Sequence, residues 1–267
     1  MAKLQELFTQ ARRGQSGGGM GFLGKSKADV KPRSAVLVVD FPLVTAGNAE
    51  AALKAGADGI LFNWDGKDEA ILETFKKEIA SAQVTNEQLV AGLRLAGNLE
   101  HINRETLTRI KEQGFQYIIL PFNAPARLLA METKDLEKVV VVPLRTDELY
   151  PIYIRNLTAL DGIAAVLLDF ALEEKIGSLT IEDILDYRAV RDAVRFPAFL
   201  RIPNNLSEND IYAIAPLGVQ CVILSADAIT EKTSAQIKNV RSLLEKVYEE
   251  EKGKDKDTLS ISPTSRK

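Results

Sequence analysis

Cysteine and histidine are almost absent from this 267-residue sequence, which contains one of each, Cys221 and His101. A single cysteine excludes an intramolecular disulfide and any zinc site built from several cysteines. A single histidine excludes every metal centre that needs two or three imidazoles, and any acid–base pair of two histidines. The chain therefore cannot carry out chemistry that needs several cysteines or more than one histidine.

Long apolar runs and an excess of positive charge are also missing. No run approaches the roughly 18 apolar residues of a membrane span, and the first residues lack the apolar core of a signal peptide. The 34 basic residues are outnumbered by 37 acidic ones, so the formal net charge is −3. That balance argues against a nucleic-acid partner. We expect a soluble, cytoplasmic protein with no membrane partner, and its composition is compatible with a homo-oligomer.

Eight apolar runs of strand length alternate with amphipathic stretches of helix length. Each run is continuously apolar, which is typical of strands in a parallel sheet that helices cover. The runs span residues 34–41, 57–63, 88–95, 115–122, 138–145, 163–170, 197–204 and 219–226. Eight strand–helix units predict an α/β protein with a (β/α)8 barrel over residues 34–250. A doubly wound open sheet is the alternative.

Glycines repeat with the period of two strand–helix units. They precede the even-numbered runs, and each can take the left-handed conformation that ends a helix. The repeated glycines are Gly56, Gly114, Gly162 and Gly218. A fourfold period favours a closed barrel, because the core layers of such a barrel come from alternate strands.

The two ends of the chain differ from the predicted barrel. Residues 1–33 form an N-terminal extension, in which residues 4–13 predict a short helix that closes the barrel floor. Residues 251–267 are polar and lack an apolar face, which predicts a disordered tail. The segment GMGFLGKS, residues 19–26, matches two phosphate-loop patterns. It has no strand before it and Pro32 after it, so we interpret it as a flexible glycine linker that binds no nucleotide.

The run EAALKAGADGILF, residues 50–62, resembles the helix–strand unit common to many (β/α)8 enzymes. These include phosphate-binding barrels, flavin-dependent barrels and acid aldolases or lyases. The resemblance covers one of the eight units, so it implies the TIM-barrel superfamily at the level of the fold and no specific family.

Arginine recurs at the predicted strand ends, where the active site of such a barrel lies. The odd-numbered runs align as VLVVD, VAGLR, VVPLR and PAFLR, with equivalent last residues Asp40, Arg94, Arg145 and Arg201. An unpaired charge buried against the helices would be very costly, so these side chains should point into the barrel mouth. Counting from the repeated glycines gives the neighbouring positions Asn63, Pro121, Asp169 and Ser225. Three guanidinium groups and two carboxylates leave a net positive charge for a ligand.

These residues predict an enzyme of the lyase or isomerase class that acts on a small anionic metabolite, a carboxylate or a phosphate ester. The candidate anion-binding residues are Arg94, Arg145, Arg201, Asn63 and Ser225. The candidate catalytic residues are Asp169, Asp40 and His101, the last of which lies in a loop on the same face. If a divalent cation such as Mg²⁺ is bound, Asp40 and Asp169 are its candidate ligands.

Two alternative functions stay open at the level of the sequence. A non-catalytic barrel that binds a ligand or a protein partner would keep the arginine layer, which could also be a structural salt-bridge network. A flavin-dependent oxidoreductase is the second alternative, and the absence of glycine-rich loops after the last two runs disfavours it. No lysine stands at a strand end, which disfavours a Schiff-base aldolase.

Overall fold

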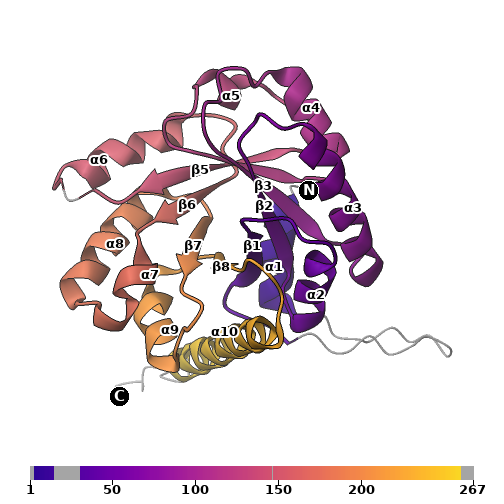
Figure 1. The fold of residues 1–267 in the computed structure, drawn as a ribbon. Coiled ribbons are helices and arrows are strands. Elements are labelled where there is room, and N and C mark those ends of the chain that lie inside the picture. The colour runs from indigo at the N-terminus through magenta and orange to yellow at the C-terminus, as the bar shows by residue number, and fades with distance from the viewer. Residues whose placement is uncertain (1–2, 15–30, 146, 260–267) are drawn as a thin grey trace, which may run out of the picture.

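The computed structural model describes residues 3–14, 31–145 and 147–259. Its eight strands form one closed parallel barrel in the order β1 to β8, with helices on the outside (Figure 1). The first strand pairs with the last, from Val36 opposite Cys221 to Asp40 opposite Ser225. The predicted (β/α)8 barrel is therefore confirmed, and the open-sheet alternative is wrong.

Each strand coincides with one of the eight apolar runs of the sequence. The strands are β1 Val36–Phe41, β2 Gly59–Trp64, β3 Val90–Leu95, β4 Tyr117–Leu120, β5 Glu137–Pro143, β6 Ala165–Asp169, β7 Ala198–Ile202 and β8 Cys221–Ser225. Side chains alternate between the inside of the barrel and the surrounding helices, and both environments are apolar. This double burial explains why the runs are continuously apolar.

The helices connect the strands and cover the outside of the barrel. They are α1 Lys3–Arg13, α2 Asn48–Ala55, α3 Ala70–Thr85, α4 Arg104–Glu112, α5 Arg127–Ala130, α6 Tyr150–Ile154, α7 Leu172–Lys175, α8 Ile181–Val194, α9 Glu208–Ile214 and α10 Glu231–Leu259. Short 3₁₀ turns lie at Arg155–Ala159, Ile176–Ser178 and Ala215–Leu217. Among the described residues, no helix is long and apolar enough to cross a membrane.

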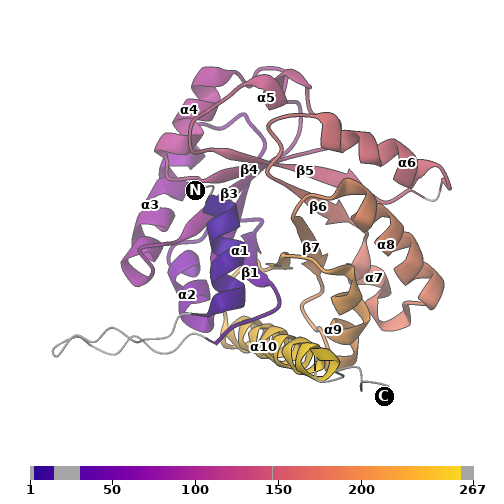
Figure 2. The same ribbon diagram turned by 180° about the vertical axis from the view of Figure 1, so that it is seen from behind.

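Helix α1 closes the floor of the barrel, as the sequence predicts. Its apolar face is buried with the inward-pointing residues of the strands. Phe8 of this helix meets Phe199 of β7 edge to face, with ring centroids 5.8 Å apart. Figure 2 shows α1 in front of β1 when the molecule is seen from behind.

The repeated glycines have the backbone conformation that the sequence predicts. Their φ angles are 114° at Gly56, 98° at Gly114, 83° at Gly162 and 59° at Gly218. A residue with a β-carbon adopts this left-handed region only with strain. The glycine repeat therefore marks the turns that precede the even-numbered strands.

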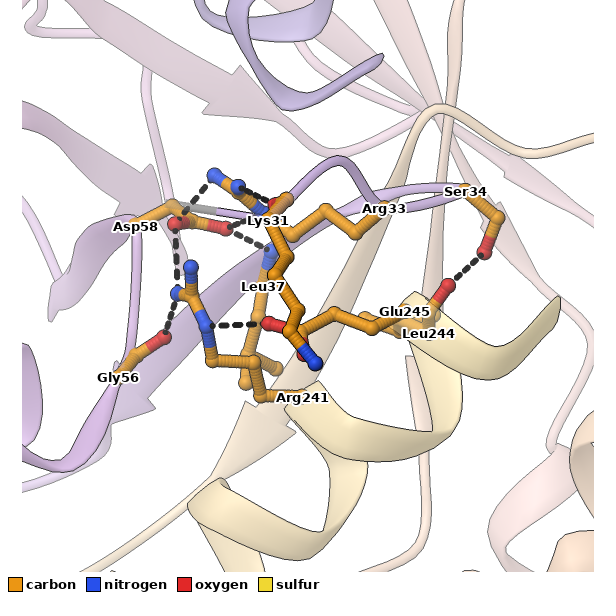
Figure 3. A network of polar contacts seen from close by, with 9 residues as sticks. All are labelled: Lys31, Arg33, Ser34, Leu37, Gly56, Asp58, Arg241, Leu244 and Glu245. Carbon is orange, nitrogen blue, oxygen red and sulfur yellow. Dashed lines mark hydrogen bonds and ion pairs between the residues drawn. The ribbon is translucent and has the colours of Figure 1, made fainter. Parts of the chain in front are cut away.

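A buried ionic network joins the segment before β1 to the C-terminal helix (Figure 3). Arg33 donates two hydrogen bonds to Asp58, from Nε at 2.8 Å and from Nη2 at 2.5 Å. Arg241 of α10 donates from Nη1 to the same carboxylate at 3.2 Å and to the carbonyl of Gly56 at 2.6 Å. The backbone N–H of Leu37 completes the set of donors to Asp58, at 2.9 Å.

The C-terminal helix extends into the segment that the sequence analysis assigns to the tail. Helix α10 continues to Leu259, past the predicted end of the ordered chain at residue 250. Residues 249–257 are rich in glutamate and lysine, which are good helix formers even where no apolar face exists. The rest of the predicted tail, residues 260–267, and the glycine segment 19–26 lie outside the described residues.

Candidate functional site

Polar side chains occupy two successive layers at the C-terminal end of the barrel. A path that steps from each residue to its partner on the next strand, once around the barrel, returns to β1 eight residues away from its starting residue. This displacement is the stagger of a TIM barrel. With this stagger, side chains at one height advance by one residue from each strand to the next. The lower layer consists of Asp40, Arg94, Val141 and Arg201. The upper layer consists of Asn63, Pro121, Asp169 and Ser225.

Asp40 is the buried centre of the lower layer. Its side chain is 2% exposed, and each carboxylate oxygen accepts a hydrogen bond from a side chain of another strand, β2 or β7. Asn63 donates from Nδ2 to Oδ1 at 2.6 Å, and Arg201 donates from Nη2 to Oδ2 at 2.8 Å. The Arg201 side chain is 20% exposed. This paired carboxylate holds the Arg201 guanidinium group at the mouth.

Arg201 is only partly satisfied by this pairing. Its Nε is buried and has no hydrogen-bond partner among the described residues. A buried donor without a partner loses the free energy of its hydration, so this atom favours an additional acceptor in the mouth. Arg94 lies at the same height on β3, and its strand partner on β2 is Asn63. The lower layer thus carries two guanidinium groups and one carboxylate.

Arg145 differs from the sequence-based expectation. The register places Val141 in the lower layer, and Arg145 lies four residues further on, beyond the end of β5 at Pro143. Its side chain is exposed, and its guanidinium carbon is 6.0 Å from the ring centroid of Phe122 and 5.5 Å from that of Tyr150. Arg145 therefore belongs to the rim of the mouth, where the aromatic rings of Phe122 and Tyr150 support it.

The upper layer holds the second acidic candidate. Asp169 ends β6 and is exposed, with Pro143 of β5 as its strand partner. Ser225 ends β8 opposite Asp40 on β1. The counting from repeated glycines thus placed all four residues of this layer at one height, as the register shows. Their roles toward a ligand stay a prediction.

His101 lies apart from the two layers. It is exposed, in the loop between β3 and α4, and its Nε2 lies 2.6 Å from the carbonyl oxygen of Gly66 in the neighbouring loop after β2. A carbonyl can only accept, so the histidine donates this hydrogen bond. The contact joins two mouth loops. A role for His101 in proton transfer stays a prediction.

The donor set around Asp40 does not suit a divalent cation. Both of its oxygens already accept N–H hydrogen bonds, one of them from a positively charged guanidinium group. In the described ranges, no group of three or more His, Cys, Asp or Glu side chains is placed to hold a metal ion. Asp169 is the remaining candidate ligand of the predicted pair.

Comparisons with known proteins identify the fold. No family model matches the chain, and no curated protein matches it. Among solved structures, tryptophan synthase from M. tuberculosis is similar, with a TM-score of 0.57 and 13% identity over 92% of this chain and 100% of that one. The HpcH/HpaI aldolase from Desulfitobacterium hafniense DCB-2 has a TM-score of 0.51 and 12% identity, over 87% and 95% of the two chains. A 3-hexulose-6-phosphate synthase has a TM-score of 0.51 and 15% identity, over 78% and 99%.

Likeness at these low identities reflects the fold alone, since one fold supports many unrelated reactions. The closed parallel barrel and its structural neighbours together show that the chain has the TIM-barrel fold.

Proposed function

We propose that the chain is a TIM-barrel enzyme of the lyase or isomerase class that acts on a small organic anion, a carboxylate or a phosphate ester. The observation that carries this proposal is the lower layer of the mouth, where the buried Asp40 forms an ion pair with the partly buried Arg201, beside Arg94. Bulky branched apolar side chains dominate the layers of such barrels. Charged side chains in their place favour a polar ligand at the end of the barrel where active sites lie.

The charges of the mouth favour an anion. Asp40 and Asp169 balance Arg94 and Arg201, and Arg145 at the rim adds one further positive charge. Arg145 rests on aromatic rings and Arg201 has an orphaned Nε, so both can turn toward oxygens of a ligand. Guanidinium groups bind carboxylates and phosphates through paired, charge-assisted hydrogen bonds.

The two aspartates have separate roles in this proposal. Asp40 is a positioning residue, because its buried carboxylate is already bound to Arg201 and Asn63. Asp169 is exposed at the strand end and serves as the general base, which removes a proton from carbon beside the anionic group. The negative charge that then develops on the substrate oxygens is stabilised by Arg94 and Arg201.

Anion binding is tested first. Mass spectrometry of the purified protein identifies organic acids that co-purify, and calorimetry then measures their affinity. We expect Arg201→Met to weaken binding by at least about tenfold, because a charge-assisted hydrogen bond is lost, and Arg201→Lys to weaken it less. Arg109→Gln is the matched control, since Arg109 pairs with Glu69 on the outer surface. Equal affinities in wild type and Arg201→Met would refute the site.

Turnover is tested with Asp169→Asn, which keeps the size of an exposed side chain. We expect this variant to bind the same acid with unchanged affinity and to lose turnover by about 10²- to 10⁴-fold, because it cannot accept a proton. Nuclear magnetic resonance of substrate and product measures the rate. Binding without turnover in the wild-type protein would refute the enzyme and leave a ligand-binding barrel.

A further inference from the structure

A positively charged cavity lies at the floor of the barrel, at the end opposite Asp40. It has a volume of about 500 Å³ and lies between α1, the end of α8 and the N-terminal ends of β7 and β8. Four arginines line it: Arg12, Arg13, Arg191 and Arg195. Its volume is within the range of small-molecule binding sites.

The charges of these arginines are not balanced by acidic groups in the cavity wall. No described aspartate or glutamate lines the cavity, and none of the four arginines forms an ion pair within the described ranges. Asp192, the sequence neighbour of Arg191, pairs with Arg188 on the exposed side of α8. Glu251 shares the wall of an adjoining smaller cavity with Arg12. Four unpaired guanidinium groups therefore gather in a chain whose net charge is −3.

Arg191 is fixed at the inner wall of the cavity. Its Nη2 lies 3.3 Å from the carbonyl oxygen of Gly218 and 3.3 Å from Oε1 of Gln220. Gln220 is itself held, because its Oε1 accepts the backbone N–H of Ala198 at 2.8 Å. Burial lowers the pKa of Arg191, and its Nε is buried without a partner among the described residues. This side chain is thus held in place while one of its donors has no acceptor.

The ends of two helices explain only part of this arrangement. Cations at helix C-termini are favoured by the helix dipole, and Arg12 and Arg13 end α1 while Arg195 caps α8. Arg195 does so with a left-handed φ of 58°, which is uncommon for a residue with a side chain. The dipole accounts for cations near each helix end. It does not require four of them to line one cavity with no acidic neighbour.

We propose that this floor cavity binds a small phosphorylated molecule with two or more negative charges. Guanidinium groups match phosphate oxygens through paired hydrogen bonds, and four of them line this one cavity. The ligand would join α1, which supplies Arg12 and Arg13, to α8 and to the starts of β7 and β8. This site is separate from the mouth, so it does not depend on the proposed enzymatic function.

Inorganic pyrophosphate is the probe, and calorimetry on the full chain at about 0.15 M salt is the measurement, since distant charges are screened there. We expect saturable binding at the floor cavity. Arg191→Gln and Arg13→Gln should each weaken it by at least about tenfold, the effect of one charge-assisted contact. Arg13 is exposed, so its variant should fold even if Arg191→Gln does not. Circular dichroism checks that each variant is folded.

Two matched variants separate the floor cavity from other sources of binding. Arg188→Gln removes the same charge from α8 outside the cavity, and Arg201→Met removes an arginine from the mouth. Arg188→Gln should keep pyrophosphate affinity within about twofold of wild type, because it does not touch the cavity. Arg201→Met should still bind pyrophosphate at the floor cavity, whether or not the mouth also takes this anion. No binding up to about 10 mM, which is weaker than specific recognition requires, would overturn the proposal. An equal loss in Arg188→Gln, or a loss only in Arg201→Met, would overturn it as well.

Discussion

Single residues determine how the interior of the barrel is filled, and Gly92 with Tyr117 is the clearest case. A β-carbon at Gly92 of β3 would lie 2.1 Å from Cζ of Tyr117 on β4, so only glycine leaves room for the ring. The Tyr117 hydroxyl is buried and has no hydrogen-bond partner among the described residues. Burial raises the pKa of Tyr117 well above its ordinary value. The Tyr117 hydroxyl is therefore neutral and makes no hydrogen bond with the described residues.

Tyr117→Phe removes this unsatisfied hydroxyl and keeps the ring. We expect the free energy of unfolding to stay the same or to rise by up to about 1 kcal/mol, because a desolvated donor is deleted. Gly92→Ala is the contrasting change and should lower it by at least about 2 kcal/mol through overpacking. Urea denaturation measures both. A loss of more than about 1 kcal/mol in Tyr117→Phe would mean that the hydroxyl has a partner.

The residues of the mouth could be predicted from the sequence where the strand ends are well defined. Asp40, Arg94 and Arg201 fall in one layer, because their apolar runs end at the charged residue. Arg145 does not, because the β5 run continues past the paired part of the strand. Pro143, which has no N–H for a sheet, was the available signal that the strand ends there. Hydrogen-bond partners and cavity walls depend on packing and could not be predicted.

At the scale of elements, α1 shows how a short helix is fixed to the barrel floor. The carboxylate of Glu137, at the start of β5, accepts the backbone N–H of Leu4 at 2.7 Å. Burial raises the pKa of Glu137 above its ordinary value of 4.5, and the N–H groups of Leu4 and Lys3 oppose the shift. The amphipathic pattern predicted α1 but not this contact, which joins residues 133 positions apart.

Because the pKa of Glu137 is raised in the folded chain, its contribution to the free energy of unfolding decreases as the pH rises. The folded chain holds this proton at pH values where the unfolded chain has lost it. The contribution of Glu137 to the free energy of unfolding is therefore full below pH 4.5 and falls as the pH rises through the folded-state pKa. We expect the free energy of unfolding of the wild type, relative to that of Glu137→Gln, to decrease between about pH 4 and pH 7 in urea titrations. A difference that increases with pH would contradict this assignment.

At the scale of the whole molecule, the first strand pairs with the last, and an ionic network joins segments that lie near them. Asp58 lies between Arg33, ahead of β1, and Arg241 of α10, and its side chain is 8% exposed (Figure 3). Eight apolar runs and a glycine period were enough to predict this closed barrel, because the strand-length runs, the helical stretches and the repeated glycines all indicate the same architecture. The network was not predicted, since Asp58 and Arg241 lie 183 residues apart in the sequence.

Asp58→Asn tests how much this network contributes to the stability of the barrel. We expect the free energy of unfolding to fall by about 3–5 kcal/mol, because two arginines lose their shared buried carboxylate. Glu69→Gln is the control, since it breaks the exposed pair with Arg109 and should change stability by less than about 1 kcal/mol. Guanidinium denaturation of both variants makes the comparison. Equal losses in the two variants would show that burial of the network contributes nothing.

The central claim is that the C-terminal mouth of this barrel binds a small organic anion. A crystal structure of the protein soaked with a panel of small carboxylates and phosphate esters tests it most directly. We predict electron density for one anion between Arg94 and Arg201, within reach of Asp169, and loss of that density in Arg201→Met. Anions bound only elsewhere on the molecule, with the mouth unchanged in every soak, would contradict the claim.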